Sequence, residues 1–123
     1  MYTQEQNREI EKVISIFEHY IKDSSHFDLV WSNKMGYVFL DGISKDQDAF
    51  CMSPIVLRDG KTLCREIIYH IACDVVEEKG KTHDLQSCSQ REREEIRERL
   101  FPYMEQLPEY DHLVVELFKN SRV

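Results

Sequence analysis

The sequence predicts one α+β domain over residues 1–123, with an N-terminal helix, a three-stranded antiparallel meander and then three helices (α-β-β-β-α-α-α). Two observations lead to this prediction. Apolar residues recur at helical spacing near the N-terminus and after residue 60, whereas between these segments they alternate with a period of two. No repeat, low-complexity tract or flexible linker interrupts this order, so nothing marks a second domain. Strands gathered together and helices gathered together are typical of α+β layering.

The first helix is expected to begin after Thr3 and to end near Asp23. Thr3 can cap the helix while Gln6, three residues later, reaches back to it, which is the pattern of a capping box. One apolar stripe then extends along the segment through Ile10, Val13, Ile14, Phe17, Tyr20 and Ile21.

The first two strands are predicted by a change of period. Phe27, Leu29 and Trp31 alternate with residues that point the other way, which indicates a half-buried strand. Residues 32–36 supply turn chemistry. Residues 37–40 are apolar at every position, so this segment is expected to be a central strand covered on both sides.

The third strand is expected over residues 49 to about 57. We place a bulge at Gly42 and a turn at residues 45–48 before it. Pro54 has no N–H to donate to a ladder, so this strand should lie at an edge of the sheet or bend at Pro54.

The clearest core helix is predicted over residues 61 to about 79, with Gly80 just after its end. Its apolar face contains Leu63, Cys64, Ile67, Ile68, Ile71, Ala72 and Val75. The next helix is expected to begin at Ser89, which forms a second capping box with Glu92, and to continue through a solvent-facing Pro102. Pro108 suits the first turn of the last helix.

Charge and cysteine usage limit the class of protein. Acidic residues outnumber basic ones by 23 to 16, a net charge of −7, which disfavours binding to nucleic acid or to an anionic membrane surface. The N-terminus has no signal-like pattern, and no apolar run approaches the ~18 residues of a membrane span. The four cysteines include no C-x-x-C pair, so free thiols and a cytoplasmic location are expected.

The most specific set of potential metal ligands lies on the predicted helix over 61–79. Glu66, His70, Cys73 and Glu77 recur at helical spacing on one stripe. Four such residues span roughly 16 Å along a straight helix, so at most two or three can reach one ion. Glu66, His70 and Cys73 are the metal candidates, and the alternative is a solvated face with a Glu66–His70 pair. We expect no cofactor.

The sequence contains no phosphate-binding loop, no dinucleotide-binding glycine motif and no nucleophile elbow. The second and third strands are apolar on both faces, and one face needs a second chain if the helices cover only the other. We therefore expect a noncatalytic interaction protein, a small regulator, adaptor or chaperone-like factor that forms a homodimer. It would bind through the sheet near residues 50–57 and the mixed-charge helix over 91–99. The alternative is a small metal- or thiol-dependent enzyme that uses the helical polar stripe, followed by a nucleic-acid binder.

Overall fold

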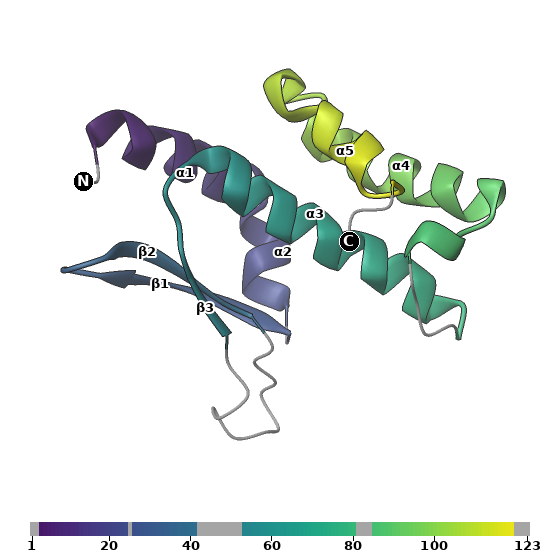
Figure 1. The fold of residues 1–123 in the computed structure, drawn as a ribbon, viewed down its shortest axis with the longest axis horizontal. Coiled ribbons are helices and arrows are strands. Elements are labelled where there is room, and N and C mark those ends of the chain that lie inside the picture. Colours follow the sequence, from purple (N-terminus) through teal and green to yellow (C-terminus); the bar gives the residue numbers. More distant parts are fainter. Residues whose placement is uncertain (1–2, 25, 42–52, 81–84, 120–123) are drawn as a thin grey trace. The chain divides into compact units, whose positions relative to one another are not determined.

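The computed structural model describes residues 3–24, 26–41, 53–80 and 85–119, and it confirms the α+β class (Figure 1). The α-helices are α1 (Gln4–Ile16), α2 (Glu18–Asp23), α3 (Gly60–Glu78), α4 (Gln90–Met104) and α5 (His112–Glu116). The strands are β1 (Phe27–Ser32), β2 (Gly36–Asp41) and β3 (Ser53–Val56), and short 3-10 helices occur at η2 (Leu85–Ser87) and η3 (Pro108–Tyr110).

The chain forms two compact units, Met1–Leu63 and Cys64–Val123, and the boundary falls in the first turns of α3. We call them the sheet unit and the helical unit. The sheet unit contains α1, α2 and the three strands, whereas the helical unit contains most of α3 and all that follows. The expectation of one domain over the whole chain stays a prediction.

The N-terminal segment begins as predicted but is divided into two helices. The Thr3 hydroxyl accepts a hydrogen bond from the Gln6 backbone N–H at 3.0 Å, and the Thr3 N–H donates to the Gln6 side chain at 2.7 Å, which completes the capping box. The expected single helix is broken at Phe17, whose φ and ψ are −99° and 17°. Neither proline nor glycine marks this break. The Phe17 side chain is completely buried, so the helix changes direction at a residue that packs into the core.

The sheet has the order β1-β2-β3 with antiparallel pairing, so β2 is the central strand as predicted. The Ser32 hydroxyl accepts hydrogen bonds from the N–H groups of Lys34 and Met35, both at 3.2 Å, and Gly36 ends this turn with a φ of 80°. Gly36 supplies the left-handed conformation that other residues rarely adopt. Pro54 lies on the edge strand β3, as its missing N–H predicts.

Part of the prediction for the third strand lies outside the described residues. This applies to the bulge at Gly42, the turn at residues 45–48 and the strand residues 49–52. The described part of the strand begins at Ser53, and Leu57 follows it with its N–H donating to the Tyr37 carbonyl at 3.0 Å.

One face of the sheet packs against α1 and α2, which both lie on the same side of it (Figure 1). Phe27 stacks on Phe39 with ring centroids 4.7 Å apart, and Tyr20 from α2 lies 6.0 Å from Phe27. The Tyr37 hydroxyl donates to Glu11 of α1 at 3.1 Å. The buried apolar residues of this unit include Ile10, Val13, Phe17, Phe27, Val38, Phe39, Leu57 and Leu63.

The apolar face predicted for α3 is buried, with Leu63 in the sheet unit and the residues from Cys64 to Val75 in the helical unit, and Gly80 follows the helix with a φ of 76°. Ser89 and Glu92 form the second capping box, and α4 continues through an exposed Pro102 as expected. The last predicted helix is divided into η3, which begins at Pro108, and the short α5. None of the described helices combines the length and the apolar character that a membrane span requires.

Salt bridges connect α3 with α4 inside the helical unit. The Arg99 guanidinium donates two hydrogen bonds to the Glu78 carboxylate, at 2.9 and 3.2 Å, and the ammonium of Lys79 lies 2.9 Å from the carboxylate of Glu95. Because Arg99 donates to it, the pKa of Glu78 lies below its ordinary value. The bidentate geometry therefore fixes one end of α3 beside α4.

Candidate functional site

The predicted metal ligands Glu66, His70 and Cys73 lie on α3 with half-buried side chains. Among the described residues, these three do not belong to a group of metal-ligating side chains whose ligand atoms lie together. Each of them takes part in other interactions. The metal site stays a prediction, and the structure adds no geometry that favours it.

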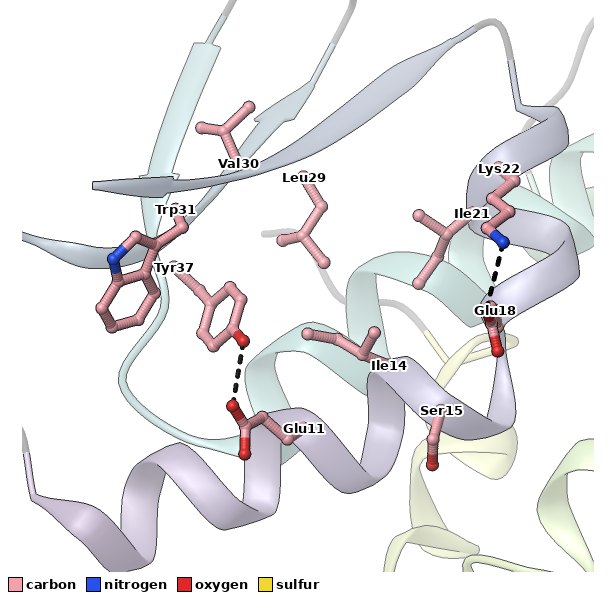
Figure 2. Close-up of a pocket in the computed structure, with 10 residues that line it drawn as sticks. All are labelled: Glu11, Ile14, Ser15, Glu18, Ile21, Lys22, Leu29, Val30, Trp31 and Tyr37. Atoms are coloured by element: carbon pink, nitrogen blue, oxygen red, sulfur yellow. Dashed lines mark hydrogen bonds and ion pairs between the residues drawn. The ribbon is translucent and has the colours of Figure 1, made fainter. Parts of the chain in front are cut away.

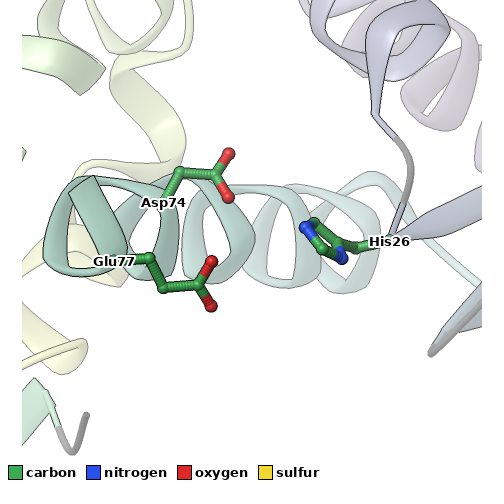
Figure 3. Close-up of side chains that lie close together, drawn as sticks. All are labelled: His26, Asp74 and Glu77. Carbon is green, nitrogen blue, oxygen red and sulfur yellow. The ribbon is translucent and has the colours of Figure 1, made fainter. Parts of the chain in front are cut away.

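Two further acidic residues of α3 lie one turn apart. The carboxylates of Asp74 and Glu77 point toward the same side of the helix (Figure 3). His26, which Figure 3 also draws, precedes β1 and belongs to the sheet unit. Exposed acidic pairs are common on helices and repel one another when no cation is present. We therefore derive no metal centre from the acidic pair.

The thiol of Cys64 is buried in the helical unit, and burial raises its pKa to about 12. The carboxylate of Glu109 acts in the same direction, and Arg65 opposes it. A nucleophilic cysteine has to be a thiolate at neutral pH, whereas this thiol stays protonated. Cys64 is thus a small core residue, as its place on the apolar stripe indicates. The described cysteines Cys64, Cys73 and Cys88 are free thiols.

The mixed-charge run of α4 contacts the C-terminal part of its own unit. The guanidinium groups of Arg93 and Arg97 each lie 5.3 Å from the centre of the Phe118 ring. These are cation–π distances, and the two arginines are one helical turn apart, so both hold the same buried phenylalanine. Arg93 also donates to the Gln86 carbonyl at 3.3 Å. Part of this charge therefore stabilises the helical unit.

The sheet face opposite α1 and α2 carries a row of three valines. The register places Val30 opposite Val38 and Val38 opposite Val56, so the three side chains lie on one face across all three strands. The side chains at the two ends are exposed, Val30 by 37% and Val56 by 38%, while Val38 between them is buried. Asp28, Leu40 and Pro54 form the neighbouring row, so one carboxylate borders the valines. We call this surface the valine face.

On the other side of the sheet, a cavity of about 480 Å³ lies between the helices α1 and α2 and the strand β1 (Figure 2). Its lining includes Glu11, Ile14, Glu18, Ile21, Leu29 and Tyr37. Leu29 points toward the helices, whereas the side chain of its neighbour Val30 points away from them (Figure 2). We call this cavity the β1 groove.

The sequence did not single out the β1 groove as a binding element. Ile14 and Ile21 belong to the apolar stripe of the predicted first helix, where they were expected to face a filled core. Ile14 precedes the break at Phe17 and Ile21 follows it, and both residues line the groove. In the sequence, the feature that could have indicated this groove is a pair of carboxylates, Glu11 and Glu18, at the border of the apolar stripe.

Comparison of the chain with protein-family models, with curated proteins and with solved structures gives no match. The most specific candidate surfaces of the described residues are the valine face and the β1 groove.

Proposed function

We propose that this protein is a noncatalytic protein-interaction module, a small regulator, adaptor or chaperone-like factor. The observation that carries this proposal is the exposure of apolar side chains on the sheet unit. Val30 on β1 and Val56 on β3 lie at the two ends of the valine face, and both side chains are exposed. Apolar side chains that gather on one exposed surface are typical of protein–protein interaction sites.

The partner that we propose for the valine face is a second copy of this chain. A two-fold contact brings the same surface of both protomers together, and a row of valines is complementary to itself because it carries no charge. The chain has a net charge of −7, so two copies repel one another wherever acidic surfaces meet. An apolar face is consequently the favourable place for self-association.

Size-exclusion chromatography with light scattering tests this proposal. We expect the wild-type protein to be a dimer, and Val56→Asp to weaken self-association by at least about tenfold, or ~1.4 kcal/mol. Val115→Asp is the matched control, because Val115 is a similarly exposed valine on α5 in the helical unit. A wild-type protein that stays monomeric at high concentration would remove the homodimer from the proposal.

We also propose a reducing, cytoplasmic location. The free thiols of Cys64, Cys73 and Cys88 support it, because cysteines in oxidising compartments are commonly paired in disulfides. The net charge of −7 supports a partner that is a protein, in preference to a nucleic acid or an anionic membrane.

A further inference from the structure

The β1 groove has the dimensions and chemistry of a binding site. Its volume of about 480 Å³ lies within the range of roughly 300–1,000 Å³ that is usual for ligand pockets. Its apolar side chains Ile14, Ile21 and Leu29 come from α1, α2 and β1, three different elements of the sheet unit. Tyr37 lies at one end of the groove, where its hydroxyl points to Glu11 (Figure 2).

The strand that borders the groove is an edge strand. In the described sheet, β1 pairs with β2 on one side only. The backbone N–H of Leu29 donates to the side chain of Asp28 at 2.8 Å, so this N–H is directed away from β2. Backbone groups two residues apart along a strand point to the same side, and a row directed outward can pair with another strand.

A strand that joins β1 would extend both faces of the sheet. Its alternate side chains would continue the face that carries Leu29 and would thus lie over the groove. One extended ligand can therefore make both kinds of contact: its backbone pairs with the outer edge of β1, and its apolar side chains fill the β1 groove. An extended segment therefore fits this site better than a helix does.

The acidic side chains at the β1 groove favour an extended segment that carries a basic residue. Glu11 and Glu18 contribute two carboxylates, and Lys22, which lies 3.1 Å from Glu18, contributes one cation. The carboxylate of Glu11 accepts the Tyr37 hydroxyl, and a carboxylate has room for further donors. A lysine or arginine of the ligand would find its counter-charge here. A second copy of this acidic chain would bring the same carboxylates to the contact, which like-charge repulsion disfavours.

We propose that the β1 groove binds an extended segment of a partner protein that adds to the outer edge of β1 as a fourth strand, with apolar residues and a basic residue at alternate positions, so that all of them face the groove. This inference rests on the proposed function, a protein-interaction module, but it uses the face of the sheet opposite to the valine face. The incoming strand would lie at the edge of the sheet, beside Val30 at one end of the valine face.

Asp28 regulates the edge in this arrangement. A carbonyl of the incoming strand has to replace the Asp28 carboxylate as the acceptor for the Leu29 N–H. An acidic side chain on an edge strand also protects the free protein from unwanted pairing. A substitution of Asp28 that removes the acceptor for the Leu29 N–H should therefore favour binding of the incoming strand. A substitution that removes only the charge of Asp28 should have little effect.

The test measures, by fluorescence anisotropy, the binding to the full chain of a fluorescein-labelled peptide that has threonine at every second position and valine, valine and lysine at the positions between, so that these three side chains share one face. We expect Ile14→Glu to weaken binding at least about tenfold, and Glu11→Gln, an exposed change that keeps the fold, to weaken it about threefold. Val56→Asp, on the opposite face, should leave the affinity unchanged. Asp28→Ala should tighten binding, whereas Asp28→Asn, which keeps an acceptor for the Leu29 N–H, should change it little.

Two control peptides define the outcome. The same peptide with glutamate in place of lysine should bind more weakly, and the lysine peptide with methylated backbone nitrogens should fail to bind. Equal binding to wild type, Ile14→Glu and Glu11→Gln would overturn the proposal, as would an absence of binding to the wild-type protein. If no peptide binds while Val56→Asp dissociates a dimer, the groove proposal fails and the interaction module stands. If the wild-type protein is also a strict monomer, both fail.

Discussion

The sheet unit and the helical unit expose apolar side chains in different ways. Among the described residues of the sheet unit, the large exposed apolar residues Val30, Trp31, Met35 and Val56 all belong to the meander and its turn. In the helical unit, Tyr69, Phe101 and Val115 are exposed one to each helix. Scattered apolar residues are normal on protein surfaces, whereas exposed apolar residues that share one face, as Val30 and Val56 do, are typical of a contact site.

The two units also use their charges differently. In the helical unit, ion pairs connect α3 with α4, and two arginines of α4 hold the Phe118 ring. In the sheet unit, the ion pair of Lys22 with Glu18 lies within α2, and the carboxylate of Asp28 occupies an edge N–H. In the helical unit these groups connect different elements, whereas in the sheet unit they act within α2 or β1, and the Tyr37–Glu11 hydrogen bond connects β2 with α1.

The largest effect is expected from truncation of the cores, which tests whether the units unfold together. Phe39→Ala in the sheet unit should lower the free energy of unfolding by about 3–5 kcal/mol, and Leu100→Ala in the helical unit by about 2–5 kcal/mol, because both side chains are buried. Urea unfolding would be followed by the fluorescence of Trp31, the single tryptophan, and by far-UV circular dichroism. One domain requires that both probes report the same midpoint in each variant. A fluorescence transition that moves alone with Phe39→Ala would establish two independent domains.

An intermediate effect is expected at the two capping boxes, one in each unit. Ser89→Ala should destabilise the protein by about 1 kcal/mol, because Glu92 of this box is buried and its partner hydroxyl is lost. Thr3→Ala should cost less, about 0.5 kcal/mol, because that box is exposed. Ser89→Asn, which retains a capping oxygen, should be close to wild type in the same urea experiment. Equal losses for Ser89→Ala and Thr3→Ala would contradict the difference that burial predicts.

The smallest effect is expected for the salt bridge between α3 and α4. The pKa of Glu78 is lowered in the folded protein, so its stabilising effect is present at neutral pH and is lost as the pH falls through the folded pKa. Arg99→Gln should therefore cost at most about 1 kcal/mol at pH 7, since both groups are exposed, and nothing well below about pH 4. Arg91→Gln, an exposed change on the same helix, should show no such pH dependence. A cost for Arg99→Gln that is constant between neutral and strongly acidic pH would refute this assignment.

Local patterns in the sequence predicted most of the elements. The Thr3–Gln6 and Ser89–Glu92 boxes, the central strand and the end of α3 at Gly80 depend on interactions over a few residues, which a sequence displays directly. The break at Phe17 has no such local cause. Its position coincides with the complete burial of a side chain, which depends on residues distant in the chain.

The candidate surfaces show the same division. From the sequence alone, the protein is an acidic α+β chain with a meander that is apolar on both faces and with a buried, unreactive Cys64 on the stripe of α3. Only the tertiary structure decided which face of the meander the helices α1 and α2 cover, and that Ile14 and Leu29 line a groove. The physical reason is that spacing determines which side chains share a face, whereas packing between elements determines whether that face is filled, hollow or exposed.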